Sequence, residues 1–227
     1  MTKYDVYGIG NAIVDKEFEV QDSFLAEHGI EKGMMTLVDR DQQVFILDQL
    51  IKTYGLKKRA GGGSAANSLY ALSQFGGKAF YSCRVANDET GDFFLEGLGQ
   101  HNIETNTNSQ RADGLSGRCL VMVTPDAERT MQTYLGVSDD ISISEMDFES
   151  AKQSKIMYLE GYLVTSDSAK SAIIEMKEYA IANNIKTAMT FSDPAMVEYF
   201  CDAVNEVLGD GVDLLFCNEE EAMLYTG

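Results

Sequence analysis

The sequence has few of the residues on which several common chemistries depend. Its only histidines, His28 and His101, lie in polar segments beside predicted helices, so no Ser-His-Asp arrangement is supported. Its four cysteines are scattered and form no Cys-x-x-Cys pair, which argues against a zinc site or a disulfide framework. No apolar leader follows Met1 and no run of 18 apolar residues occurs, so we expect a cytoplasmic protein without a membrane partner.

Basic residues are also scarce. The chain has 18 Lys and Arg against 36 Asp and Glu, a net charge of −18, and such a surface repels nucleic acid and anionic lipid. It does not exclude a phosphorylated ligand, because backbone amides and a bound cation can neutralise phosphate locally. With 227 residues, 44% of them apolar, the chain has enough material for one large α/β domain or two small ones.

The apolar pattern predicts alternating strands and helices. Residues 4–10 resemble the first strand of an α/β sheet, and Leu69, Leu72 and Phe75 mark the predicted buried side of a helix that follows three glycines. From residue 155 onward the order is strand–helix–strand, with predicted helices over 168–182, where Ile173, Met176 and Ala180 share one face, and over 195–208. This order predicts a parallel sheet with right-handed crossovers. Extended segments near 13–38 and a hairpin near 117–135 predict a small second sheet, so we expect one domain, 1–227, with a small appendage.

Two glycine patterns bear on ligand binding. Gly8-x-Gly10 begins a dinucleotide-binding fingerprint, but Ile13 occupies the third glycine position and no helical pattern opens there, which disfavours an NAD-binding oxidoreductase. Gly61, Gly62 and Gly63 run directly into a predicted helix, an arrangement that suits either a site for a polar or anionic small molecule or a tight turn with a serine cap.

Polar residues follow several predicted strands, where ligands bind in open α/β sheets. Asp15 could accept hydrogen bonds from sugar hydroxyls or be a surface turn residue, and Glu160 could be a solvated loop charge. Asn67 lies in the first turn of the helix after the glycines. Asn218 precedes three glutamates, a pattern that favours helix capping over metal binding when taken alone.

Several segments, taken in order, resemble the PfkB, or ribokinase-like, carbohydrate kinases, and within them the branch of adenosine kinase and its bacterial sugar-kinase relatives. They are 10–15 (GNAIVD), 61–67 (GGGSAAN), 88–92 (DETGD), 124–131 (TPDAERTM), 159–163 (LEGYL) and 218–221 (NEEE). The resemblance implies a three-layer α/β/α domain with a mostly parallel central sheet and a small β-sheet lid over the sugar site. It implies a kinase that transfers the γ-phosphate of ATP to a primary hydroxyl of a sugar or nucleoside, with Mg²⁺ and an optional monovalent cation as cofactors.

The same resemblance implies roles for individual residues. Asp15 would bind hydroxyls of the sugar or ribose in a pocket also lined by Gly61, Gly62, Gly63 and Asn67. Glu160 and Arg129 match positions near the substrate or the lid. Asn218 and Glu221 would place phosphate and magnesium, the metal through water. An exposed lid sheet invites edge pairing, so a homodimer through the lid is a further hypothesis.

The sequence departs from the family pattern in two places. Ala86 stands where the family usually has glycine, and the Gly-Ala-Gly-Asp segment that supplies the catalytic base is expected downstream of Gly227. We therefore expect the 227 residues alone to be inactive. A non-catalytic sugar- or nucleoside-binding module stays open as an alternative. Which of Phe18, Met35, Met122, Tyr134 and Tyr162 line the substrate pocket also stays open.

Overall fold

The computed structural model describes residues 2–106 and 111–227. Its main sheet has six strands in the order β11-β10-β9-β1-β5-β6, and every neighbouring pair is parallel. The strands are β1 (Tyr4–Ile9), β5 (Ala79–Ser82), β6 (Ile103–Thr105), β9 (Ser154–Glu160), β10 (Lys186–Thr190) and β11 (Leu214–Phe216). The parallel sheet expected from the alternation of strands and helices is confirmed, and all carboxyl ends lie at one edge.

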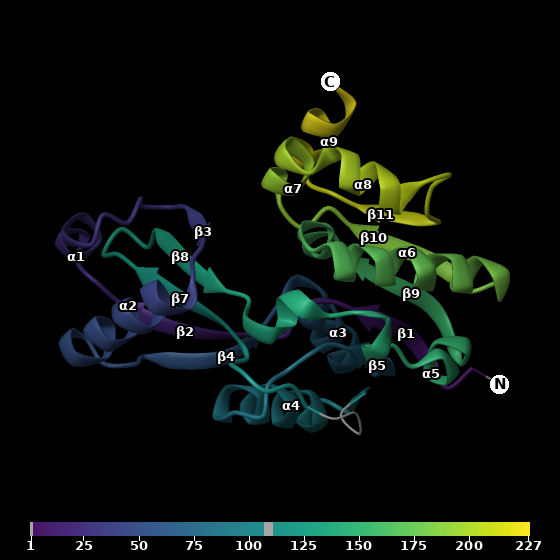
Figure 1. Ribbon diagram of the computed structural model, residues 1–227, viewed down its shortest axis with the longest axis horizontal. Helices are drawn as coiled ribbons and strands as arrows, with labels where there is room; N and C mark the ends of the chain where they lie inside the picture. Colours follow the sequence, from purple (N-terminus) through teal and green to yellow (C-terminus); the bar gives the residue numbers. More distant parts are fainter. Residues whose placement is uncertain (1, 107–110) are drawn as a thin grey trace.

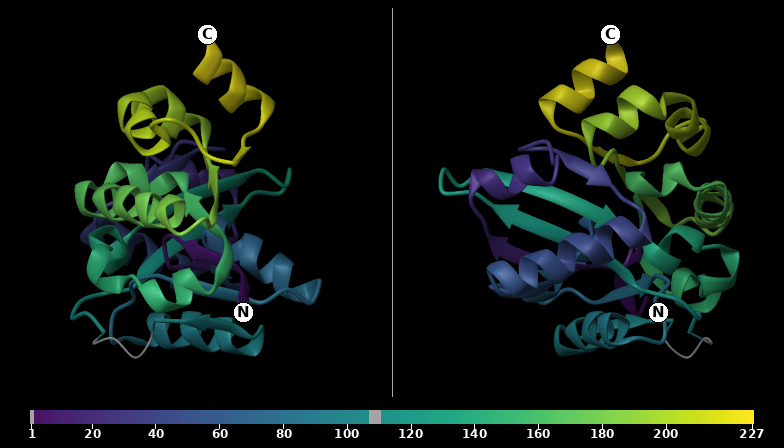
Figure 2. Two further views of the ribbon diagram at one scale, coloured as in Figure 1. Left: turned by 90° about the vertical axis from the view of Figure 1, so that its right-hand side faces the viewer. Right: turned by 60° about the vertical axis from the view of Figure 1, so that its left-hand side comes forward.

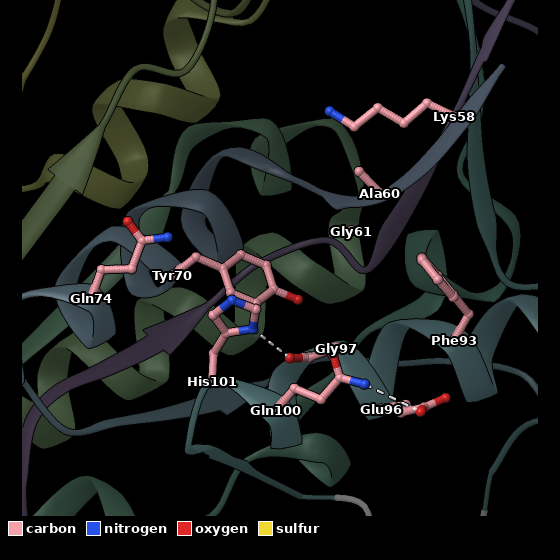
Figure 3. A pocket seen from close by; sticks show the side chains of 10 residues that line it. All are labelled: Lys58, Ala60, Gly61, Tyr70, Gln74, Phe93, Glu96, Gly97, Gln100 and His101. Atoms are coloured by element: carbon pink, nitrogen blue, oxygen red, sulfur yellow. Dashed lines mark hydrogen bonds between the residues drawn. The ribbon is translucent and has the colours of Figure 1, made fainter.

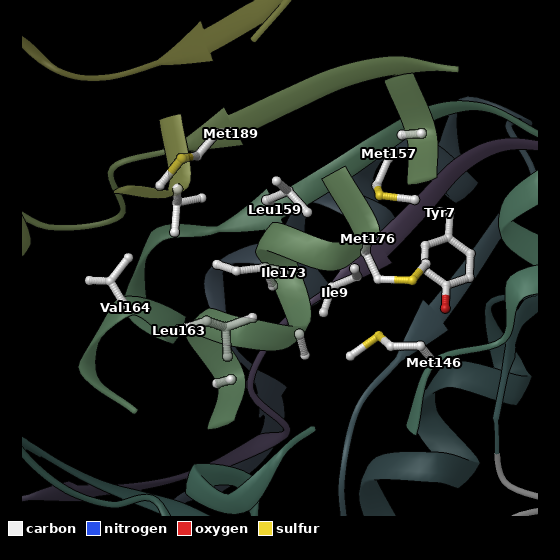
Figure 4. Close-up of a cluster of buried hydrophobic side chains, with 14 of the residues drawn as sticks. Tyr7, Ile9, Met146, Met157, Leu159, Leu163, Val164, Ile173, Met176 and Met189 are labelled. Atoms are coloured by element: carbon white, nitrogen blue, oxygen red, sulfur yellow. The ribbon is translucent and has the colours of Figure 1, made fainter. Parts of the chain in front are cut away.

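Helices cover both faces of this sheet (Figures 1 and 2). On one face α3 (Ser64–Gln74) and α4 (Glu89–Gln100) pack through Leu69 and Phe94 against Tyr81 of β5. The other face is covered by α5 (Phe148–Lys152), α6 (Asp167–Ala182), α7 (Pro194–Tyr199) and α8 (Cys201–Leu208). Figure 4 shows Ile173 and Met176 of α6 packed among Tyr7, Ile9, Met157 and Leu159 from the two central strands. The result is a three-layer α/β/α core.

A second sheet of five strands projects from the carboxyl edge of the first, and we call it the lid (Figure 1). Its order is β3-β8-β7-β2-β4, with β2 (Ile13–Glu19), β3 (Met35–Leu37), β4 (Lys58–Gly62), β7 (Gly117–Val123) and β8 (Arg129–Tyr134). The expected hairpin is confirmed, because β7 and β8 pair antiparallel. Helices α1 (Asp22–Glu27) and α2 (Arg40–Thr53) bury one face of the lid through Phe24, Ile46 and Leu50.

The structure corrects three details of the sequence interpretation. Lys58–Gly62 forms a lid strand against β2, so Gly61 and Gly62 belong to a strand and only Gly63 makes the turn. Phe75 is 90% exposed, because the helix ends at Gln74 and Phe75 is its C-cap. The helix expected over 195–208 divides at Phe200 into α7 and α8.

Short helices and one terminal helix complete the described chain. Three 3-10 helices, η1 (Gly136–Asp140), η2 (Ile143–Glu145) and η3 (Gly161–Thr165), connect elements of the core, and α9 (Glu219–Thr226) follows β11. Within residues 2–106 and 111–227, no helix combines the length and apolar character that crossing a membrane requires.

Candidate functional site

The main candidate site is a cavity of about 290 Å³ between the lid and the carboxyl ends of the core strands, which we call the acceptor pocket. The lid supplies most of its apolar wall and the core supplies polar groups. Its lining residues are Asn11, Ile13, Asp15, Met35, Leu37, Gly63, Ser64, Asn67, Cys119, Arg129, Met131, Thr133, Leu135, Glu160, Tyr162 and Ser192. Five of the residues to which the family resemblance assigns a site role therefore meet here: Asp15, Gly63, Asn67, Arg129 and Glu160.

Asp15 is the half-buried carboxylate of this pocket. Its backbone lies in β2 between Ala60 of β4 and Cys119 of β7. Its side-chain oxygens accept no hydrogen bond from any described residue. Burial raises the pKa of Asp15 above its ordinary value, and the nearby positive charge of Arg129 opposes that rise. A carboxylate that is partly desolvated and has no partner is available to accept hydrogen bonds from ligand hydroxyls.

Gly62 and Gly63 leave room that a side chain would fill. A Cβ atom on Gly62 would lie 2.7 Å from Oδ1 of Asp15, so glycine lets the strand run directly beside the carboxylate. Gly63 has φ +98°, and a Cβ atom there would lie 2.6 Å from the carbonyl oxygen of Asn11. Gly61 does not line the acceptor pocket, because its missing side chain faces the hydroxyl of Tyr70 instead.

Glu160 is fully buried, and it is neither a solvated loop charge nor a free ligand-binding group. Its Oε2 accepts from the backbone N–H of Asn11 at 2.5 Å, and its Oε1 accepts from Ser64 Oγ at 2.7 Å and the N–H of Ala65 at 3.1 Å. Burial raises the pKa of Glu160, and these hydrogen bonds oppose the rise. The carboxylate thus ties the ends of β1 and β9 to the first turn of α3, from which Asn67 projects.

Arg129 and Asn67 present exposed polar groups at the pocket. Arg129 is the first residue of β8. Its positive charge acts to lower the pKa of Asp15, although the two side chains form no ion pair. Asn67 is in the first turn of α3, and its backbone N–H donates to the carbonyl of Gly63 at 3.0 Å. Both side chains can reorient toward a ligand, because no described residue holds either one.

Asn218 and Glu221 lie outside the acceptor pocket, at the start of α9. Asn218 Oδ1 accepts from the N–H of Glu221 at 2.8 Å, and the Glu221 carboxylate accepts from Asn218 N at 3.0 Å and Nδ2 at 3.2 Å. This is a reciprocal capping box, the local structure that the sequence favoured. Across the described residues, no group of three or more His, Cys, Asp or Glu is arranged to hold a metal ion.

The structure adds Ser192, which the sequence did not single out. It follows β10 with φ +72°, an uncommon conformation for a residue with a side chain. Its Oγ accepts from the N–H of Gly161 at 2.9 Å and lies 3.3 Å from Ser64 Oγ. The signal that could have revealed it is its position directly after a core strand.

Of the five side chains considered for the pocket wall, Met35 and Tyr162 line it. Phe18 and Met122 are buried on the opposite face of the lid, under α1 and α2, and Tyr134 is not part of the lining. Strand alternation explains the difference. Phe18 and Asp15 lie three residues apart on β2, so their side chains point to opposite faces of the lid.

The fold and the pocket together define an α/β protein with a cavity, partly polar and partly apolar, between its sheet edge and a lid. Residues 32–227 match the family described as pfkB family carbohydrate kinase, and the chain belongs to this family.

Individual relatives agree with this assignment. The chain is 23% identical to guanosine-inosine kinase of Escherichia coli over 98% of its length and 52% of the relative, and 25% identical to adenosine kinase of Saccharomyces cerevisiae over 94% of its length and 63% of the relative. The adenosine kinase structure from Sinorhizobium meliloti superposes with a TM-score of 0.88 at 36% identity, covering 98% of this chain and 67% of that one. The structure of a probable sugar kinase from Rhizobium etli superposes with a TM-score of 0.89 at 31% identity, covering 99% of this chain and 67% of that one. The chain thus spans about half to two thirds of these relatives.

Proposed function

We propose that the protein containing this chain is an ATP-dependent kinase that phosphorylates the primary hydroxyl of a nucleoside. The observation that carries the proposal is the Asp15 carboxylate, half-buried and without a hydrogen-bond partner among the described residues. Such a group, beside the glycine backbone at Gly62, can accept hydrogen bonds from two neighbouring ribose hydroxyls.

The wall of the acceptor pocket favours a nucleoside over a free sugar. Ile13, Met35, Met131 and Leu135 form an apolar surface on the lid side, opposite the polar groups of the core. A planar base can bury its faces on this surface, whereas the hydroxyls of a bare sugar would lose water there without gaining partners. The names of the adenosine and guanosine-inosine kinase relatives support the same choice.

Arg129 and Asn67 have supporting roles in this proposal. Arg129 lies close enough to influence Asp15, and its guanidinium can follow the ligand as the lid closes. Closure excludes water, which would otherwise compete with the acceptor hydroxyl for the phosphate. Asn67, in the first turn of α3, can hydrogen-bond the part of the acceptor nearest the core.

The phosphate side of the reaction involves the start of α9. The Glu221 side chain is buried and both of its oxygens accept hydrogen bonds from Asn218, so the group fits a contact to a hydrated Mg²⁺ through water and not a direct chelate. When bound, Mg²⁺ neutralises phosphate charge during transfer. Asn218 holds the Glu221 carboxylate in place for that contact, and both residues follow a core strand at the same edge as the acceptor pocket.

An acceptor panel tests the proposal on the complete gene product. With ATP and Mg²⁺, we expect ADP release with adenosine, guanosine or inosine to exceed that with ribose or fructose by at least about tenfold, since one apolar surface contributes about 1.4 kcal/mol or more. 5′-Deoxyadenosine, which lacks the primary hydroxyl, is the control and should release no ADP, and ³¹P NMR should show a phosphate monoester. Preference for a free sugar would overturn the nucleoside assignment, and absence of acceptor-dependent ADP release would overturn the kinase activity.

A further inference from the structure

A second cavity, of about 560 Å³, lies between β4, α3 and α4 and shares no lining residue with the acceptor pocket. We call it the helix-side pocket. Figure 3 shows side chains from all three elements around it, with the rings of Tyr70 and Phe93 on opposite sides. Its lining residues are Lys58, Ala60, Gly61, Tyr70, Gln74, Phe93, Glu96, Gly97, Gln100 and His101.

Aromatic rings form its walls. The rings of Tyr70 and His101 meet edge to face with centroids 4.8 Å apart, and His101 Nδ1 donates to the carbonyl of Gly97 at 2.9 Å. The guanidinium of Arg59 lies 3.9 Å from the centroid of Phe93 and fixes that ring. The pocket is therefore bounded by rings that are already held in place, which suits a flat aromatic ligand.

Two glycines keep the space open around Tyr70. A Cβ atom on Gly61 would lie 2.9 Å from the Tyr70 hydroxyl, and one on Gly97 would lie 3.2 Å from it. The hydroxyl itself donates to no described residue, and burial raises the pKa of Tyr70 to about 12, so it remains a neutral donor. A ligand in the pocket can accept this hydrogen bond.

The rim carries an unpaired positive charge. Lys57 pairs with Glu19 and Arg59 with Glu89, whereas Lys58 between them forms no ion pair with any residue that the structure describes. The carboxylate of Glu96 accepts a hydrogen bond from the side-chain amide of Gln100. Because the whole chain carries a net charge of −18, the pocket suits one negative charge and not several.

We propose that the helix-side pocket is a second small-molecule site, which takes a flat aromatic compound bearing one carboxylate or similar anionic group. The ring system lies between Tyr70 and Phe93, and the anion faces Lys58 and accepts from the Tyr70 hydroxyl. The ligand is distinct from the phosphate acceptor, because on β4 the missing side chain of Gly61 faces Tyr70 whereas that of Gly62 faces Asp15.

The test uses 1-naphthoate as the probe, with calorimetric titration of the complete protein. Gly97→Met fills the pocket, and Gly99→Met is the matched control on the same helix, because a side chain at Gly99 meets nothing within 4 Å. We expect Gly97→Met to weaken binding at least tenfold and Gly99→Met to change it less than twofold. Asp15→Asn should leave probe binding unchanged.

A surface variant covers the case in which Gly97→Met fails to fold. Lys58→Gln should weaken naphthoate at least threefold while leaving 1-naphthalenemethanol, the uncharged analogue, unaffected. The proposal is overturned if naphthoate shows no saturable binding, if Gly97→Met binds it as the unsubstituted protein does, or if Asp15→Asn weakens it equally. None of these outcomes depends on whether the protein phosphorylates a nucleoside.

Discussion

The Asp15 carboxylate faces the acceptor pocket in surroundings that raise its pKa above the ordinary value of 3.8. A raised pKa means that the folded protein favours the protonated acid. The stability contributed by that preference is present below about pH 3.8 and is lost as the pH rises through the folded pKa. At neutral pH the ionised group therefore costs stability, a cost that the proposed role in binding would explain.

Asp15→Asn should consequently make the protein more stable at pH 7. We expect its Tm to rise by about 2–4 °C, equivalent to about 1 kcal/mol for a domain of this size, and the gain should vanish below pH 4. Scanning calorimetry across this pH range measures the effect. The exposed Glu175→Gln in α6 is the control and should shift Tm little. A lower Tm for Asp15→Asn at pH 7 would contradict this electrostatic account.

Gly62 gives a second prediction at the residue scale. In Gly62→Ala the added Cβ atom would lie 2.7 Å from Asp15 Oδ1, so the carboxylate must move from its position in the pocket. We expect the Kd for the acceptor to rise about tenfold, or about 1.4 kcal/mol. Gly99→Ala, where the added methyl meets nothing, should bind as the unsubstituted protein does. Equal acceptor affinity in both variants would show that Gly62 does not set the position of Asp15.

Sequence alone located Asp15 and Asn67 but could not assign Glu160 or Ser192. Asp15 lies near the start of β2, the strand after β1, and Asn67 lies in the first turn of α3, and local patterns reveal both positions. The role of Glu160 depends on three hydrogen-bond donors, the N–H of Asn11, the hydroxyl of Ser64 and the N–H of Ala65. These donors lie about a hundred or more residues away in the chain. The left-handed backbone of Ser192 likewise has no signature in a single side chain.

At the scale of elements, Glu160 joins the ends of β1 and β9 to the start of α3. Glu160→Gln puts an amide NH₂ among backbone and hydroxyl donors, so at least one donor loses its acceptor. We expect the free energy of unfolding to fall by about 2 kcal/mol, measured by urea denaturation. The exposed Glu175→Gln in α6 should be nearly neutral. If both variants are equally stable, the Glu160 carboxylate does not hold these elements together.

The regular elements were the most predictable part of the fold. Long periodic segments such as α6 gave the buried positions Ile173, Met176 and Ala180 correctly. The lid strand β4 was missed, because its sequence, KRAGG, has no apolar alternation and low strand propensity. It forms because β2 offers a pairing edge, and such tertiary context is not visible in a local pattern.

At the scale of the whole molecule, the lid ends in two free edges, β3 and β4. Beside β3, Met34 and Leu37 are each 51% exposed, an apolar edge that favours pairing with another chain. We propose a homodimer through the lid and expect sedimentation velocity at micromolar concentration to show a dimer, which Met34→Lys shifts toward monomer. Lys52→Ala on the exposed side of α2 is the control. Monomer alone over the whole concentration range would remove this hypothesis.

The most direct test of the account is calorimetric titration of the complete protein with the acceptor that it phosphorylates fastest, comparing Asp15→Asn with the exposed Glu175→Gln. Loss of a charge-assisted hydrogen bond costs about 1.5–3 kcal/mol, so Asp15→Asn should weaken acceptor binding by about 10-fold to 100-fold. Glu175→Gln, on α6 and outside the acceptor pocket, should change it less than about twofold. Acceptor binding that is equally tight in Asp15→Asn and the unsubstituted protein would contradict the central claim that this carboxylate holds the phosphate acceptor.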